Sequence, residues 1–381
     1  MQTSLYIHFP FCLKKCLYCD FNSVADSPLK PAEYVATLVR EMELCAKTLR
    51  APVTAPTLYF GGGTPSLMEP ELVGAIIDAA ARLFGLEADG EITIEANPGT
   101  LTLEKLAGYR TAGVNRLSLG VQSFDDPLLA RLGRVHTADE AMAAYAAARA
   151  AGFTNIGIDL IHSLPGQSVE MWRNALDRAT SLAPEHISAY GLSIEEETPF
   201  FRLEEAGALP LPDEEEAVAM FEATIEVLAG KGYQYYEISN FALPGFRSRH
   251  NQVYWRRGNY LGFGAGAHSF LREPDWGVRW KNPDSYVPYL EAVQRSVLAA
   301  EERHPLSRRE ALSEAFFLGL RLLDGVDLRL LEGEFGPAVE EYFAAPIREL
   351  TAQGLLAADA GRLCLSPRAI IVANQVFARF L

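Results

Sequence analysis

Three cysteines near the start of the chain have the residue type and spacing to hold a metal centre. Cys12, Cys16 and Cys19 lie within eight residues, directly after an apolar run that alternates like a strand. Thiolates on one loop can converge on one centre, and iron–sulfur clusters are usually held by four of them. The fourth is missing locally, which would leave one iron open to another ligand. A zinc site that adds His8 is the alternative, since zinc accepts three cysteines and one histidine.

Six strand-like segments alternate with amphipathic helical segments between residues 5 and 231. They are 5–9 with 31–49, 57–60 with 69–84, 91–95 with 102–112, 116–120 with 127–132 and 138–151, 155–161 with 169–182, and 186–192 with 214–231. This alternation predicts a parallel sheet covered by helices. Six units are too few for a closed eight-stranded barrel. A partial (β/α)6 barrel and an open doubly wound sheet both fit the pattern.

Polar or glycine-rich residues occupy the carboxyl-terminal ends of the expected strands, where barrels of this kind carry their function. They are Cys12 to Cys19, Gly61 to Pro65, Glu95 with Asn97, Gln122 with Ser123, Asp159, and Ser193. A carboxylate in an apolar strand, such as Asp159, is costly to bury unless it has a partner. Glu95 or Asp159, taken alone, could simply cap a neighbouring loop or pair with an arginine. Their shared position at the strand ends predicts one convergent site instead.

The stretch from Tyr6 to Cys19 resembles the cluster loop of the radical S-adenosylmethionine (SAM) superfamily. It has the spacing CxxxCxxC with Tyr18 before the last cysteine. The preceding frame YIHFPFC is similar to the branch that contains oxygen-independent coproporphyrinogen oxidases and HemW-type haem chaperones. The resemblance implies that Cys12, Cys16 and Cys19 hold a [4Fe-4S] cluster whose open iron binds SAM. It also implies electron transfer that cleaves SAM to a 5'-deoxyadenosyl radical, and it favours the partial barrel.

The same resemblance assigns a larger set of residues to positions that contact SAM in this branch. The glycine run is not a phosphate loop, because GxxxxGK[ST] is absent. It corresponds instead to the segment that receives the methionyl amino group of SAM. The expected SAM-binding residues are Tyr6, Tyr18, Gly62, Gly63, Thr64, Glu95, Gln122, Arg134, Asp159, Ser193 and His268.

An arginine-rich stretch lies beyond residue 231, where the helical period weakens. A strand is expected at 232–239, and four arginines, a histidine, a tyrosine and a tryptophan then fall between Arg247 and Arg257. They offer a metal ligand, stacking surfaces and anion-pairing forks, which suit haem. The alternative is a loop whose arginines pair with acids and whose aromatics pack on the barrel. The motif HNxxYW, made by His250, Asn251, Tyr254 and Trp255, resembles one associated with haem binding in HemW-type chaperones, and GAGAH, residues 264–268, follows in the form those proteins show.

The last part of the chain predicts a small separate domain. Helical patterns at 306–323, 327–335 and 339–353, a hairpin at 354–360 and 362–365, and a terminal helix at 368–381 resemble the winged-helix-like domain of this branch. We therefore expect an α/β fold with a partial (β/α)6 barrel at 1–235, an irregular extension at 236–300, and a small winged-helix-like α+β domain at 301–381. Acidic residues in that domain favour a lid or docking role over DNA binding.

Composition excludes several classes of function. The net charge of −15 over 381 residues disfavours nucleic-acid binding, which calls for a basic surface. No apolar run reaches the roughly 18 residues of a membrane span, and the start does not resemble a signal peptide. Five cysteines, three of them clustered, oppose a secreted disulfide framework. We expect a cytoplasmic protein in which Cys45 and Cys364 are ordinary buried thiols.

Two functions of different classes follow from the resemblance. In one, the chain binds the cluster, SAM and haem and delivers haem to apoproteins. In the other, it is an oxygen-independent coproporphyrinogen III oxidase that converts porphyrinogen propionates to vinyls. The oxidases carry a fourth cysteine where this chain has Phe21 and a longer segment before the cluster, whereas eleven residues precede Cys12. These differences favour the haem carrier. Radical chemistry on an unrelated small molecule is a third possibility, and no catalytic residue is assigned. An electron donor and a homodimer are further expectations from the family.

Overall fold

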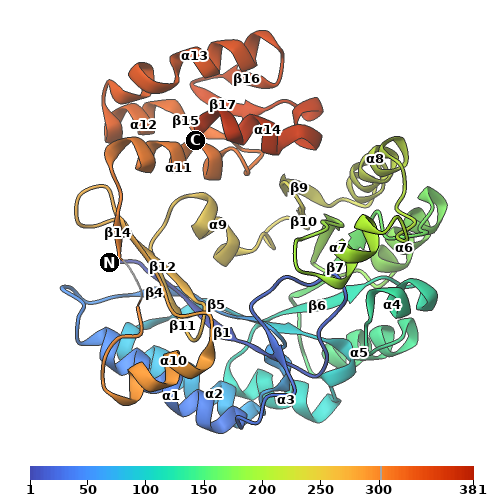
Figure 1. The fold of residues 1–381 in the computed structure, drawn as a ribbon, viewed down its shortest axis with the longest axis vertical. Coiled ribbons are helices and arrows are strands. Elements are labelled where there is room, and N and C mark those ends of the chain that lie inside the picture. Colours follow the sequence, from blue (N-terminus) through green and yellow to red (C-terminus); the bar gives the residue numbers. More distant parts are fainter. Residues whose placement is uncertain (301–302) are drawn as a thin grey trace.

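One mixed sheet runs through most of the molecule (Figure 1), which we describe from a computed structural model covering residues 1–300 and 303–381. Within these residues the sheet has twelve strands in the order β14-β13-β12-β11-β1-β4-β5-β6-β7-β8-β10-β9. Six consecutive strands of this sheet are parallel: β1 (Ser4–Phe9), β4 (Ala55–Gly62), β5 (Leu86–Ala96), β6 (Arg116–Gln122), β7 (Ile156–His162) and β8 (His186–Gly191). The prediction of six parallel strands in sequence order is confirmed.

The larger helices between and after these strands lie along the outer side of the sheet, as an arc in Figure 1. They are α1 (Pro31–Ala46), α2 (Pro70–Phe84), α3 (Leu103–Ala112), α5 (Ala138–Ala150), α6 (Val169–Ser181) and α8 (Glu214–Gly230). Two short helices, α4 (Asp126–Leu132) and α7 (Pro199–Glu205), pack instead against the cysteine loop at Leu17 and Tyr18. Helices along one side of a curved sheet make a partial barrel rather than a doubly wound sheet, which carries helices on both faces. Among the described residues, no helix combines the length and apolar character needed to cross a membrane.

Local sequence explains where these helices begin and end. α5 starts after Thr137, whose hydroxyl accepts the N–H of Glu140 while the Glu140 carboxylate accepts the N–H of Thr137. This reciprocal capping satisfies two N–H groups that a helix start leaves unpaired. α2 ends at Gly85, which has a φ of 58°, a left-handed conformation that glycine adopts without strain. Because each helix returns the chain to the same end of the sheet, the loops that follow the strands gather on one side.

The segment at 236–300 is more regular than expected. It follows β9 (Gln234–Glu237) and contains β10 (Asn240–Ala242), α9 (Arg249–Trp255), β11 (Tyr260–Phe263), β12 (His268–Leu271), β13 (Val278–Lys281) and α10 (Tyr286–Gln294). β11 pairs in parallel with β1, so the segment extends the barrel sheet beyond its first strand. These strands are three or four residues long, too short to show an alternating period in the sequence.

The carboxyl-terminal part has its own core and a small sheet in the order β15-β17-β16. Its elements are β14 (His304–Pro305), α11 (Arg308–Gly319), β15 (Val326–Asp327), α12 (Leu328–Phe335), α13 (Ala338–Ala352), β16 (Leu356–Asp359), β17 (Arg362–Leu365) and α14 (Ala373–Phe377). The three helices and the hairpin are confirmed. The single helix expected at 368–381 is instead a short helix between two 3-10 turns, and Cys364 is half-exposed rather than buried. The expected domain boundary at 300/301 touches residues outside the described ranges and stays a prediction.

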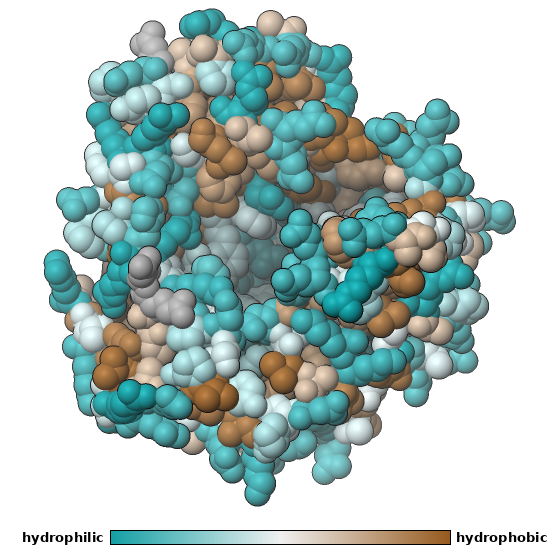
Figure 2. Space-filling view, viewed as in Figure 1, coloured by the Kyte–Doolittle hydropathy of each residue, from teal (hydrophilic) through white to brown (hydrophobic). Residues whose placement is uncertain are grey.

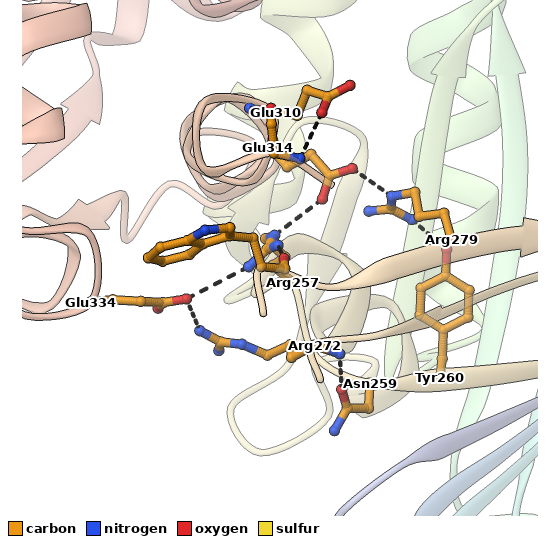
Figure 3. A network of polar contacts seen from close by, with 10 residues as sticks. Arg257, Asn259, Tyr260, Arg272, Arg279, Glu310, Glu314 and Glu334 are labelled. Carbon is orange, nitrogen blue, oxygen red and sulfur yellow. Dashed lines mark hydrogen bonds and ion pairs between the residues drawn. The ribbon is translucent and has the colours of Figure 1, made fainter. Parts of the chain in front are cut away.

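Glu314 of α11 fastens this domain to the edge of the main sheet (Figure 3). Its carboxylate accepts the Arg257 Nε–H at 3.1 Å and the Arg279 Nε–H, so one acid joins two arginines of the barrel side. Glu334 of α12 pairs with Arg257 and with Arg272. Glu314 and Glu334 therefore hold the domain on the barrel, and the expected lid or docking role of the domain stays a prediction.

Candidate cofactor site

A cavity of about 520 Å³ opens at the carboxyl-terminal ends of the parallel strands. Figure 2 shows that the molecule is hollowed near the centre of this face, between the carboxyl-terminal domain and the barrel. The cavity brings together most of the residues that the sequence placed at a convergent site. They are Cys12, Cys16, Tyr18, Cys19, Gly62, Gly63, Thr64, Glu95, Gln122, Arg134, Asp159, Ser193 and Asn251. The cysteines thus share one cavity with the acids at the ends of β5 and β7.

The cysteine loop begins at β2 (Phe11–Cys12), which pairs with β3 (Val24–Ala25) and so closes the loop on itself. All three sulfurs belong to half-buried residues that face the cavity. The Thr64 hydroxyl lies 3.4 Å from Cys12 Sγ, and Arg134 Nη1 lies 3.5 Å from Cys16 Sγ. A nearby cation stabilises a thiolate, the form that binds metal. These donors fit an iron–sulfur cluster.

The structure does not favour a zinc site that uses His8. Its Nε2 lies 2.8 Å from the carbonyl of Asn22 and its Nδ1 lies 3.1 Å from the Tyr6 hydroxyl, so both ring nitrogens are occupied. Burial lowers the pKa of His8. In the described part of the chain, no three His, Cys, Asp or Glu side chains are already gathered as a metal site. The cysteine loop would therefore draw its sulfurs together on binding a cluster.

Packing between β4 and β1 explains the glycine run, which was expected to give a ligand room. Gly62 has a φ of 114°, and a Cβ there would lie 2.7 Å from the His8 ring. A Cβ on Gly63 would lie 2.8 Å from the carbonyl oxygen of Phe11. The space that these side chains would fill is thus occupied by protein. The glycines bring Thr64 up to the cysteine loop, where its hydroxyl meets Cys12.

Two acids in the cavity are held by hydroxyl groups rather than by arginines. The Tyr59 hydroxyl donates to Glu95 Oε1 at 2.7 Å, and the Ser118 hydroxyl donates to Asp159 Oδ2 at 2.9 Å. Burial raises the pKa of Glu95 to about 7 and also raises that of Asp159. Neither acid forms an ion pair within the described residues. They therefore keep the capacity to bind a polar or cationic ligand, and Glu95 can also hold a proton near neutral pH.

The strands contribute cavity residues that sequence reasoning missed. Arg116 and Ser118 precede Gln122 on β6, and His186, Ser188 and Tyr190 lie on β8. Within each strand these residues sit two positions apart, so their side chains point to the same face. A period of two in polar residues along otherwise apolar strands was the signal that would have identified them. The cavity consequently extends from the loops down into the barrel interior.

The HNxxYW motif forms α9, which lies inside the molecule rather than on a surface loop. His250 is 1% exposed, with Nδ1 at 2.7 Å from the Thr57 hydroxyl and Nε2 at 2.8 Å from the Tyr254 hydroxyl. Its ring stacks on Tyr59 with 4.9 Å between centroids, and burial lowers its pKa to about 3. In this arrangement the imidazole offers iron no free nitrogen. Asn251 alone among the four motif residues lines the cavity.

Three of the four arginines around the motif form ion pairs, as the packing alternative predicts, whereas Arg256 donates to the Gln252 side chain. Arg247 pairs with Asp324, Arg249 with Glu87, and Arg257 with Glu314. The Trp255 ring lies under Arg321, with 4.4 Å between the guanidinium carbon and the ring centroid. These contacts hold α9 between the barrel and the carboxyl-terminal domain, and the expected haem-binding role of the stretch stays a prediction.

Two expected SAM contacts lie outside the cavity lining. Tyr6 is half-buried on β1, where its hydroxyl meets His8 and its ring stacks on Tyr59. His268 is exposed at the start of β12. Both assignments stay predictions. Tyr6 touches the cavity wall through its ring contact with Tyr59, which does line the cavity.

Comparison with known proteins agrees with this geometry. The family model of the radical SAM superfamily matches residues 6–179, and that of the HemN C-terminal domain matches residues 306–372. Heme chaperone HemW of Lactococcus lactis is 38% identical over 379 residues, covering 99% of this chain and 97% of that protein. Heme chaperone HemW of Bacillus subtilis is 36% identical over 380 residues, covering 99% of each.

A solved structure also matches over nearly the whole chain. It is the coproporphyrinogen III oxidase HemN from Escherichia coli, titled as a radical SAM enzyme, with a TM-score of 0.84 at 25% identity. The match covers 99% of this chain and 89% of that one. The identity to HemW proteins is higher and extends through both domains. The chain belongs to the HemW family of the radical SAM superfamily.

Proposed function

We propose that this protein is a haem chaperone that binds a [4Fe-4S] cluster, SAM and haem and delivers haem to target apoproteins. The observation that carries the proposal is the full-length similarity to heme chaperone HemW, at 38% identity over 99% of this chain. The cysteines and acids of one cavity support the cofactor part. Phe21, which stands where the oxidases have a fourth cysteine, supports the carrier over the oxidase.

The residues of the cavity suggest how the cofactors are held. Cys12, Cys16 and Cys19 would ligate the cluster, which, when bound, supplies an open iron site and an electron to SAM. Arg134 reaches Cys16 Sγ and also donates to the Gly120 carbonyl at 2.8 Å, so it fixes the cluster loop against β6. Glu95 presents a carboxyl group to the polar groups of SAM.

The wider setting of this function is also proposed. The chain would act in the cytoplasm, accept an electron from a donor protein, and meet haem-accepting apoproteins, with a homodimer as the assembly. Its acidic balance, with a net charge of −15, gives no support to a nucleic-acid partner.

Coproporphyrinogen oxidase activity is the second candidate. The observation that favours it is the TM-score of 0.84 to HemN, together with the match of the carboxyl-terminal domain to the HemN C-terminal domain. A shared fold hosts different functions, so the residues of the site decide between the two. Phe21 in the cluster loop is the residue that argues against the oxidase.

Anaerobically reconstituted protein separates the two functions. One sample is titrated with haem and followed by visible absorbance, and another receives coproporphyrinogen with SAM and a reductant. We expect stable haem binding without decarboxylation. Protoporphyrinogen formation would replace the carrier with the oxidase.

A matched pair of histidine variants tests the motif in the same titration. We expect His250→Ala to weaken haem binding, because it releases α9 from Thr57 and Tyr59. His304→Ala, at an exposed position on β14, is the control and should bind haem like the parent. Equal haem binding by the His250→Ala protein would remove the motif from the haem site.

A further inference from the structure

Below the cofactor residues, the barrel interior has a layer of polar side chains with unsatisfied atoms. Thr93 on β5 and Arg116 on β6 are paired in register, as are Gly157 on β7 and His186 on β8. Within the described residues, Thr93 Oγ1, Arg116 Nε and His186 Nδ1 have no hydrogen-bond partner. The three side chains are 0%, 2% and 1% exposed. Arg116 and His186 line the floor of the cavity.

Arg116 is a buried cation without a bonded counter-charge. No carboxylate in the described part of the chain lies within 4.0 Å of its guanidinium. The acids whose charges act on it are engaged elsewhere. Glu91 accepts the backbone N–H groups of Arg249 and His250, each at 3.0 Å, and Asp159 accepts the Ser118 hydroxyl. A buried charge calls for a partner that is both charged and hydrogen-bonding.

His186 adds a second donor beside Arg116. The Ser248 N–H donates to the Tyr236 hydroxyl at 3.2 Å, and that hydroxyl lies 2.8 Å from His186 Nε2. Among the described residues the Tyr236 hydroxyl has no other acceptor for its own proton, so it donates that proton to Nε2. Burial lowers the pKa of His186, so the ring is neutral and carries its single hydrogen on Nδ1. That N–H is the atom left without a partner.

Both donors border the same small space. A Cβ placed on Gly157 would lie 3.5 Å from His186 Nδ1 and 3.6 Å from Arg116 Nη2. Because residue 157 has no side chain, the guanidinium and the imidazole N–H both face the space above its backbone. A ligand there must offer acceptor oxygens and negative charge. A planar carboxylate does so, since it accepts two parallel hydrogen bonds from a guanidinium.

We propose that the floor of the cavity is a carboxylate-binding subsite formed by Arg116 and His186 above Gly157. The Arg116 guanidinium supplies the charge and a forked pair of donors, and His186 supplies a third donor that fixes the orientation. The ligand is a short carboxylic acid or the carboxylate arm of a longer molecule. The subsite lies one strand layer beneath Glu95 and Asp159, so it is distinct from the residues expected to contact SAM.

Calorimetric titration of the full-length reconstituted protein with sodium propionate tests the subsite. Propionamide has nearly the same shape without the charge and is the ligand control. We expect propionate to bind, propionamide not to bind, and Arg116→Met to weaken propionate at least tenfold. Arg82→Met, at an exposed position on α2, should bind propionate like the parent. Equal affinity of the two variants for propionate, or no binding by the parent protein, would overturn the proposal.

A measurement on the unaltered protein covers the case in which Arg116→Met does not fold. With ¹⁵N-histidine labelling, the Nδ1–H resonance of His186 should shift on addition of propionate and not on addition of propionamide. His186→Gln, which lacks this resonance, assigns the signal. A resonance that is insensitive to propionate, or a crystal soaked in propionate that shows only water above Gly157, would refute the subsite.

A competition experiment then identifies the source of the carboxylate. This experiment rests on the proposed haem binding. Displacement of propionate by haem but not by haem dimethyl ester would assign the subsite to a porphyrin side chain. Binding of propionate that neither compound displaces would assign it to a small free acid. If haem fails to bind while propionate still depends on Arg116, the carrier function fails and the subsite stands.

Discussion

Arg134 ties the cysteine loop to the wall of the barrel. It follows Gly133, which has a φ of 77° and ends α4, and a Cβ on that glycine would lie 3.1 Å from Leu17 in the loop. The tight turn therefore lets Leu17 pack close while the Arg134 guanidinium reaches Cys16 Sγ and the Gly120 carbonyl. The charge of Arg134, the turn at Gly133 and the packing of Leu17 together position Cys16 Sγ.

Replacing that sulfur tests the ligand assignment. In the Cys16→Ala protein we expect loss of the brown [4Fe-4S] absorbance, because the cluster would keep only two thiolates from this loop. Iron content and visible absorbance after anaerobic reconstitution measure the effect. Cys364→Ala, on the half-exposed strand β17, should reconstitute fully. A complete cluster in the Cys16→Ala protein would contradict the assignment.

The carboxyl group of Glu95 should make SAM binding depend on pH. Burial raises its pKa to about 7, so the group is mostly protonated at pH 6 and mostly ionised at pH 8. SAM carries a positive sulfonium, which the ionised form attracts and the protonated form does not. About one tenth of the Glu95 carboxyl group is ionised at pH 6 and about nine tenths at pH 8. The apparent Kd for SAM should therefore fall roughly tenfold between pH 6 and pH 8.

Two substitutions distinguish Glu95 from other titrating groups. Glu95→Gln should flatten the dependence of the SAM Kd between pH 6 and pH 8, measured by calorimetry. Glu104→Gln, exposed in the first turn of α3, should leave that dependence unchanged. A tenfold change that persists in the Glu95→Gln protein would assign the titration to another residue.

At the scale of elements, α9 is a connection between the cavity and the carboxyl-terminal domain. Tyr59 bonds Glu95 in the cavity and stacks on His250 of α9. His250 bonds Tyr254, whose ring meets the edge of Tyr260 on β11 at 4.7 Å between centroids. The Tyr260 hydroxyl accepts from Arg279, which is held by Glu314 of α11. This series of contacts connects the cavity wall to the carboxyl-terminal domain.

Thr57→Val tests how firmly α9 is held. The substitution keeps the side-chain shape but removes the hydroxyl that lies 2.7 Å from His250 Nδ1. A buried ring nitrogen left without a partner costs about 1–3 kcal/mol in the free energy of unfolding. Urea denaturation measures it. Thr111→Val, exposed on α3, is the control and should change stability by no more than about 0.5 kcal/mol. Equal stability of the two variants would mean that this hydrogen bond does not fasten α9.

The sequence predicts the elements whose signals are local. Six strands and their helices were placed because each repeats an apolar period, and Glu95 and Asp159 were brought together because parallel strands end at one edge. The three cysteines needed only their spacing. These features make up the barrel and much of the cavity lining.

Features that depend on distant partners were not predictable in the same way. His250 looks like a free metal ligand in the sequence, yet its partner Thr57 lies 193 positions away. Arg116 stands in an ordinary strand, and its place on the cavity floor depends on Gly157 of the next strand. β11 is recognisable as a strand only through its pairing with β1. Tertiary contacts, not local preference, determine all three.

At the scale of the whole molecule, buried ion pairs join the two domains. Side chains of Arg257 and Glu314 are 4% and 11% exposed, and the Phe270 ring lies beneath Arg257 and Arg279. Phe270 belongs to β12 of the main sheet, but it packs in the core of the carboxyl-terminal domain. The domain is therefore seated on the sheet edge through a charged and aromatic contact, which opposes free lid-like movement.

Glu314→Gln should weaken the attachment of the domain, because it removes the negative charge that Arg257 and Arg279 share and, among the carboxylates of the described residues, leaves Arg257 only its 3.6 Å contact with Glu334. Breaking a buried pair by removing one partner typically destabilises by about 3–5 kcal/mol, whereas an exposed pair contributes about 0–1 kcal/mol. Glu349→Gln, which removes the exposed pair with Arg379, is thus the matched control. We expect faster amide hydrogen exchange in α11 and a lower urea midpoint for Glu314→Gln alone. Indistinguishable exchange in the two variants would mean that apolar packing around Phe270 holds the domain without the ion pairs.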